Sequence, residues 1–146
     1  MAISFQTEGV RKPKLHYRIV SSWLKTIIRK FNGVTGELTY IFCDDEYLKE
    51  INNRYLQHDY YTDIVTFDYC KEKVISGDMF ISVERVQENS VLFECNFEHE
   101  LLRVMAHGLL HLLGHKDKTE SESEIMRGLE NECIFMFREI CNGCIK

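Results

Sequence analysis

The chain has 146 residues, of which 45% are hydrophobic and 12% aromatic, a composition typical of a globular domain rather than a disordered segment. Its formal charge of −5 argues against a protein that coats nucleic acid non-specifically, because such binding needs many bases that neutralise phosphate. Residues 1–20 lack the apolar run of an export signal and no stretch is long enough to span a membrane, so we expect a cytoplasmic protein with no membrane partner and reduced cysteines.

The first half of the chain predicts two strands and two helices. Residues 3–9 are compatible with a short strand, and apolar residues at helical spacing predict a helix over 14–31. An alternating, β-rich run predicts a strand over 36–43. Asp44 is then placed to cap a helix that covers 45–56.

The second half begins with two further strands. A β-branched and aromatic run predicts one strand over 62–69, and an alternating pattern predicts another from Gly77 onward, followed by a short helix near Glu84. Residues 97–113 read as a largely buried helix that stops at Gly114.

A last helix is predicted to start at Thr119, because Thr119 and Glu122 have the spacing of a capping box. Taken together, these elements predict one domain over 1–146 of the α+β (mixed α/β) class. We expect a small, mostly four-stranded mixed sheet covered by about five helices.

The segment HGLLHLLGHKD, residues 107–117, carries the strongest chemical signal. His107 and His111 lie one helical turn apart on one face and can bind the same tetrahedral ion. Gly114 lets the chain leave the helix and bend back, so we predict Asp117 as the third ligand of one Zn²⁺ per chain, with the fourth position left for water. His115 is the alternative third ligand. It would share the face of the two other histidines only if the helix continued through Gly114.

Two other interpretations of this segment compete with a hydrolytic metal site. One is an amphipathic helix with incidental histidines. The other is a protease, since the spacing H-x-x-x-H-x-x-G-x-x-D resembles that of metzincin-type enzymes. Those enzymes use the glutamate of H-E-x-x-H as general base, and Gly108 stands at that position here, which disfavours a protease.

HGLLHLLG resembles the signature of the YbeY family of metal-dependent endoribonucleases. Two upstream stretches, INNRYLQHDYYTDIVTF (51–67) and GDMFIS (77–82), resemble further motifs of that family in the same order. The resemblance implies a zinc-dependent, single-strand-specific endoribonuclease in ribosomal RNA maturation. It also implies the small ribosomal subunit and assembly proteins such as an Era-type GTPase as partners.

The chain departs from the family pattern at two positions that bear on activity. The third metal ligand of the family is usually a histidine, and Asp117 takes its place here. An arginine thought to contact phosphate is replaced by Leu56. These departures keep a second function open, a ribosome assembly factor with a structural zinc and little or no nuclease activity.

Four more residues are candidates for the site. Arg103 lies one turn before His107, where it could contact phosphate as a catalytic residue or serve as a cation at the edge of the core. Lys116 and Lys118 could bind the RNA backbone. Asp63 is predicted either to orient a ligand histidine by a hydrogen bond or to cap a loop.

Overall fold

The computed structural model describes residues 2–57 and 62–143, and it forms a four-stranded mixed sheet as predicted. The strands, in the spatial order β1-β2-β4-β3, are β1 (Ile3–Thr7), β2 (Val34–Cys43), β4 (Val74–Ser82) and β3 (Ile64–Asp68). β1, β2 and β4 run parallel, whereas β3 is an antiparallel edge strand beside β4. Residues 58–61 of the quoted family motif lie outside the described residues.

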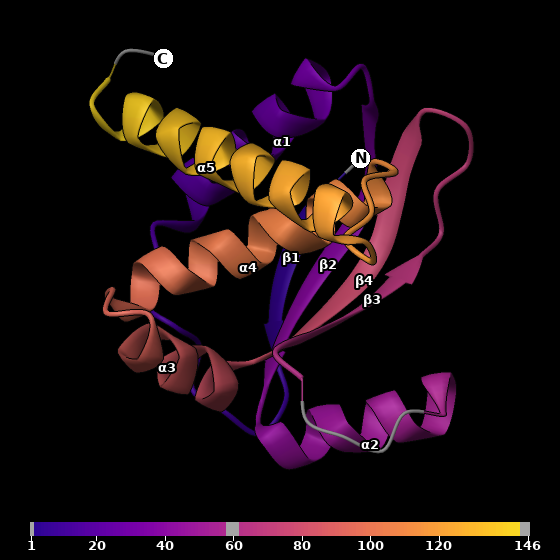
Figure 1. Ribbon diagram of the computed structural model, residues 1–146, viewed down its shortest axis with the longest axis vertical. Helices are drawn as coiled ribbons and strands as arrows, with labels where there is room; N and C mark the ends of the chain where they lie inside the picture. Colours follow the sequence, from indigo (N-terminus) through magenta and orange to yellow (C-terminus); the bar gives the residue numbers. More distant parts are fainter. Residues whose placement is uncertain (1, 58–61, 144–146) are drawn as a thin grey trace.

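The five helices of the described residues cover the sheet unequally (Figure 1). They are α1 (Tyr17–Lys30), α2 (Asp45–Leu56), α3 (Val83–Leu92), α4 (Phe97–Leu112) and α5 (Glu120–Cys141). α1, α4 and α5 enclose the main core on one face of the sheet, while α2 packs a smaller cluster on the other face. In the described part of the chain, no helix has both the length and the apolar character needed to cross a membrane.

α4 is the central helix, and ten of its residues are buried. A helix that is apolar on most sides belongs inside a protein, and α4 lies between the sheet and α5 (Figure 1). At Gly108 it approaches the sheet so closely that an added Cβ would lie 2.7 Å from Cδ1 of Ile64 and 2.9 Å from Sδ of Met79. The close packing fixes α4 and its histidines relative to β3 and β4.

Two predicted boundaries are wrong by three residues, because α1 begins at Tyr17 rather than at residue 14 and β4 begins before Gly77. β4 begins at Val74 rather than at Gly77, because Val74 and Ile75 pair with Val34 and Thr35 before the register shifts. Pairing with β2 therefore extends β4 into residues 74–76, whose sequence pattern by itself predicts a strand only weakly. The remaining predicted elements are present, including the capping box between Thr119 and Glu122 at the start of α5.

Candidate metal centre and its two pockets

The C-terminal end of α4 turns the chain back on itself at Gly114. The backbone N–H of Gly114 donates to the carbonyl of His111, and that of His115 donates to the carbonyl of Leu110, each at 3.0 Å. This hydrogen-bond pair is the Schellman motif, which needs a left-handed residue after the helix. Gly114 has φ +99°, a conformation that glycine adopts without steric cost. The chain that follows is therefore directed back towards the histidines.

Three side-chain atoms converge beyond this turn. Nε2 of His107 and Nε2 of His111 are 2.9 Å apart, and Oδ2 of Asp117 lies 3.3 Å from the first and 3.4 Å from the second. A tetrahedral ion with bonds of about 2.0–2.1 Å sets its ligand atoms about 3.3–3.4 Å apart. Two imidazoles and one carboxylate also form a donor set that zinc accepts in open catalytic sites. The three residues therefore fit one such ion.

His115 lies apart from this cluster. Its ring packs edge-on against Phe31, with the ring centroids 5.2 Å apart. In the described residues, the group of side chains that could share one ion consists of His107, His111 and Asp117. The turn at Gly114 thus brings Asp117 to the two helical histidines and sends His115 towards the end of α1.

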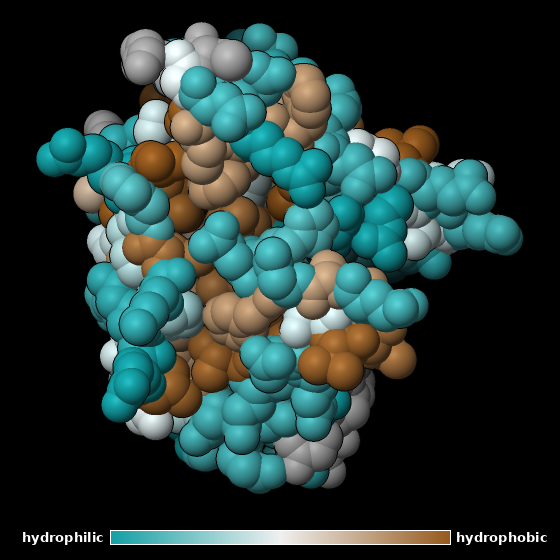
Figure 2. Space-filling view, turned by 90° about the vertical axis from the view of Figure 1, so that its left-hand side faces the viewer, coloured by the Kyte–Doolittle hydropathy of each residue, from teal (hydrophilic) through white to brown (hydrophobic). Residues whose placement is uncertain are grey.

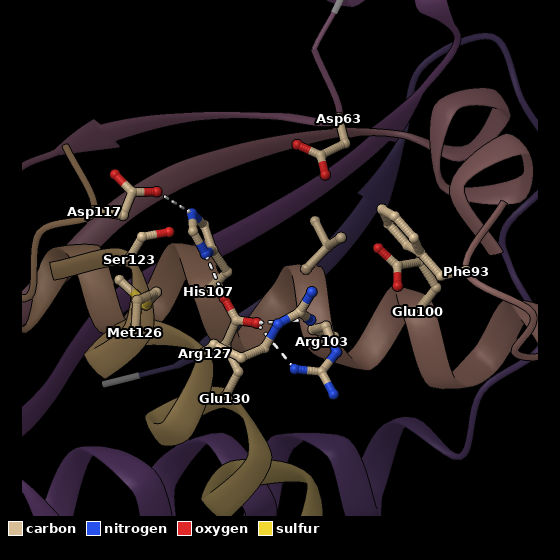
Figure 3. A pocket seen from close by; sticks show the side chains of 11 residues that line it. Asp63, Phe93, Glu100, Arg103, His107, Asp117, Ser123, Met126, Arg127 and Glu130 are labelled. Atoms are coloured by element: carbon tan, nitrogen blue, oxygen red, sulfur yellow. Dashed lines mark hydrogen bonds and ion pairs between the residues drawn. The ribbon is translucent and has the colours of Figure 1, made fainter. Parts of the chain in front are cut away.

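Glu130 of α5 holds the other nitrogen of His107 (Figure 3). Oε2 of Glu130 lies 2.6 Å from Nδ1 of His107, and Nη1 of Arg103 donates to Oε1 of Glu130 at 3.0 Å. Arg103 also donates from Nη2 to Asn131 at 2.9 Å. A carboxylate that accepts the Nδ1 proton leaves the lone pair of Nε2 free for a metal and fixes the plane of the ring.

The hydrogen bonds from His107 and Arg103 favour the ionised form of the Glu130 carboxylate. Burial alone would raise the pKa of Glu130, but the hydrogen bonds from His107 and Arg103 outweigh it and hold the pKa below its usual range. Burial likewise opposes a charged His107, yet Glu130 raises the pKa of that imidazole. Glu130 is therefore an anionic acceptor at neutral pH.

The structure places Glu130, rather than Asp63, at the Nδ1 position of His107. Asp63 lies across the cavity from α4, where burial raises the pKa of its carboxyl (Figure 3). Sequence reasoning missed Glu130, although a signal exists. Glu130 follows Met126 by four residues and precedes Cys133 by three, so a charged residue stands on the apolar face of α5.

The predicted cations occupy different surroundings. Arg103 is engaged with α5, so its predicted contact with phosphate stays a prediction. Lys116 and Lys118 are exposed, and Lys118 lines a pocket beside the cluster. Leu56 lines the same pocket, while Arg54 pairs with Glu50 on α2.

Two pockets meet at the cluster and share Asp63, His107 and Asp117. The α5-side pocket has a volume of about 290 Å³, and its lining includes Phe93, Glu100, Arg103, Arg127 and Glu130. The β3-side pocket has a volume of about 690 Å³, and its lining includes Asn52, Leu56, Thr66, Asp68, His111 and Lys118. An ion at the cluster would thus be reachable from both sides.

Gly108 explains why no glutamate serves as a base next to His107. Its missing side chain would point at Ile64 of β3 and Met79 of β4. A glutamate at this position would enter the tightly packed interface between α4 and the sheet instead of facing the cluster. The geometry therefore gives no support to the protease interpretation of this segment.

Comparisons with known proteins point to one family. A sequence model of the family described as endoribonuclease YbeY matches residues 3–138. A protein named endoribonuclease YbeY from Bacteroides fragilis is 48% identical over 139 residues, which cover 95% of this chain and 100% of that protein. One of the same name from Flavobacterium johnsoniae is 52% identical over 117 residues, covering 80% and 84%. A solution structure of a Thermotoga maritima protein has a TM-score of 0.68 at 26% identity, covering 97% of this chain and 93% of that one.

Proposed function

The chain belongs to the endoribonuclease YbeY family, and from this membership we propose that it is a zinc-dependent endoribonuclease that cleaves single-stranded RNA during ribosomal RNA maturation. The observation that carries the proposal is the convergence of His107, His111 and Asp117 between two open pockets. Three protein ligands leave the fourth position of a tetrahedral ion for water or substrate, as in catalytic rather than structural zinc sites.

A divalent ion held by His107, His111 and Asp117 would lower the pKa of a bound water and polarise a phosphoryl oxygen. The residues of the chain prepare that chemistry. Glu130 keeps the proton of His107 at Nδ1 and so directs Nε2 at the cluster. Asp117 contributes a negative charge that a histidine would not, which weakens the pull of the ion on substrate oxygens.

In the described part of the chain, few cations on the β3 side are available to contact phosphate. Among the described residues, Lys118 is the one cation that lines the β3-side pocket, and Leu56 stands where the family carries an arginine. Lys118 would therefore bind the RNA backbone, together with Lys116 on the other side of Asp117. The proposed partners are the small ribosomal subunit and assembly proteins such as an Era-type GTPase, in the cytoplasm.

A second candidate function is an assembly factor with a structural zinc. Leu56 and the net charge of −5 favour it, because both reduce the attraction of the protein for RNA. A metalloprotease has less support, since position 108 faces the sheet.

One experiment separates these functions. Purified protein is incubated with single-stranded RNA and with casein, with and without a chelator, and its zinc content is measured. His111→Ala is compared with His115→Ala, which removes a histidine that packs on Phe31 outside the cluster. We expect chelator-sensitive RNA cleavage, intact casein, and loss of zinc and cleavage only in His111→Ala.

Each other outcome contradicts a specific part of the proposal. Unchanged zinc occupancy in His111→Ala would contradict the ligand assignment. RNA cleavage that survives His107→Ala would identify a contaminating nuclease. Bound zinc without any RNA cleavage would favour the assembly factor, and chelator-sensitive loss of casein would favour the protease.

A further inference from the structure

The α5-side pocket contains a buried carboxylate that the metal cluster does not use. Glu100 is only 4% exposed, and it lines the pocket together with Phe93 and Arg103. Among the described residues, the polar contact of its side chain is the thiol of Cys95, whose Sγ lies 4.0 Å from Oε1. A buried carboxylate with so weak a partner costs free energy, because it has lost most of its hydration without gaining a strong hydrogen bond.

The position of Glu100 in the helix does not account for its burial. It lies in the first turn of α4, where the helix dipole favours an acidic residue. Glu98 lies in the same turn, however, and is exposed to solvent. The cap of α4 is Asn96, which accepts from the N–H of His99 at 2.7 Å. Glu100 is thus free to accept hydrogen bonds from a molecule in the pocket.

An exposed aromatic ring stands at the edge of the same pocket. Phe93 is 53% exposed and follows Val91 and Leu92, which are exposed by 70% and 71%. Figure 2 looks onto the side where α3 and the start of α4 lie, and brown apolar side chains gather there between teal polar ones. Figure 3 shows Phe93 beside Glu100, on the same side of the cavity. Sites for single-stranded nucleic acid combine such a ring with polar groups that read the edge of the base.

The pocket lies at a suitable distance from the cluster. Glu100 precedes His107 by seven residues, so both side chains lie on one face of α4, about 10 Å apart along the axis. One nucleotide bridges that span from its phosphate to the edge of its base. Arg103 and Arg127 also line the cavity, whose volume of about 290 Å³ accommodates a base.

We propose that the α5-side pocket binds a nucleobase of the RNA next to the scissile phosphate, with Phe93 stacked on its face and Glu100 accepting a hydrogen bond from its amino group. The proposal rests on the proposed function in taking RNA as the ligand. A carboxylate offers only acceptors, so it selects bases that present an amino group, such as cytosine and adenine. Uracil presents two carbonyls around one N–H and is bound less tightly.

The test measures binding of fluorescent six-residue 2′-O-methyl oligonucleotides of cytidine, adenosine or uridine to the full chain with zinc. We expect cytidine and adenosine to bind about tenfold more tightly than uridine. Glu100→Gln, whose amide both donates and accepts, should reduce this preference to about twofold or less. Phe93→Leu should weaken all three oligonucleotides by about tenfold, since stacking does not depend on the base.

Two matched controls isolate the pocket. Glu98→Gln makes the same change in the same turn of α4, and Phe135→Leu removes another exposed aromatic ring, which is 62% exposed on α5. Both should bind like the unmodified chain. Because Phe93 is exposed, Phe93→Leu keeps the test valid even if Glu100→Gln does not fold.

Equal affinity for all three oligonucleotides, a base preference that persists in Glu100→Gln, or no binding at all would overturn this inference. Cleavage is measured separately on mixed-sequence RNA. Base-selective binding by a chain that cleaves no RNA would contradict the proposed function alone. Cleavage without regard to the neighbouring base would contradict the base pocket alone.

Discussion

The two pockets that meet at His107 and Asp117 differ in how their charges are used. On the α5 side, Arg103, Glu130 and His107 are joined by hydrogen bonds, so their charges are already paired and their positions are fixed. On the β3 side the pocket is larger and has Lys118 as its cation among the described residues. We infer that the α5 side aligns the proposed ligands, whereas the β3 side leaves room for the proposed RNA strand and would depend on a bound ion for positive charge.

The largest expected effect comes from removing the ligand that both pockets share. Asp117→Ala leaves two ligands on α4, so zinc occupancy at limiting metal should fall at least about tenfold and RNA cleavage more than about 100-fold. Asp117→His should restore both, because it returns a third ligand at the same place. Metal analysis and a cleavage assay check this. Full zinc retention in Asp117→Ala would mean that the ion is held elsewhere.

A change confined to the α5 side should have the next largest effect. Glu130→Gln keeps an acceptor for His107 but removes the negative charge that also pairs with Arg103. We expect zinc affinity, and cleavage with it, to fall about 10–100-fold, as for other partners of ligand histidines. Glu132→Gln, an exposed neighbour on the same helix that pairs with Lys30, is the control. If both variants bind zinc alike, the α5 side does not position the ligands.

A change confined to the β3 side should act on RNA binding instead. Leu56→Arg adds a cation to that pocket and should tighten binding of single-stranded RNA several-fold at low salt. One extra phosphate contact steepens the dependence of log K on log salt by about 0.7. Val34→Arg adds the same charge at an exposed site on β2. An equal gain in both variants would show that overall charge, and not the pocket, is responsible.

The smallest effect concerns stability. Burial raises the pKa of Glu100 above its usual range, and the negative charge of Asp63 is the second cause of this increase. The carboxyl group of Glu100 therefore keeps its proton to higher pH in the folded chain than in the unfolded chain. The stability that this proton contributes to the folded chain is lost as the pH rises through the folded pKa. Glu100→Gln should raise the melting temperature by about 2–4 °C at neutral pH and by less at low pH. A gain that does not change with pH would contradict this account, and Glu98→Gln is the control.

The parts of the site that depend on local spacing were predictable from the sequence. His107 and His111 share a helical face, and the turn at Gly114 that brings Asp117 back is a local backbone motif. Thr119 and Glu122 likewise cap α5 through contacts three residues apart. Such features need no knowledge of the rest of the fold.

The parts that depend on packing between distant segments were not predictable. Glu130 reaches His107 across 23 positions in the sequence, and only the packing of α5 on α4 joins them. The start of β4 at Val74 depends on its pairing with β2. The α5-side pocket combines Asp63 before β3, the turn after α3, α4, the loop that carries Asp117, and α5, so no single stretch indicates it.

The turn at Gly114 also makes the proposed third ligand exchangeable. Asp117 lies outside every helix and strand, on a short loop between Gly114 and the cap of α5, whereas the two histidines are built into a buried helix. A substitution on the loop alters the charge around the ion without repacking the core. For protein engineering, position 117 is therefore a place where metal selectivity can be varied while the scaffold stays constant.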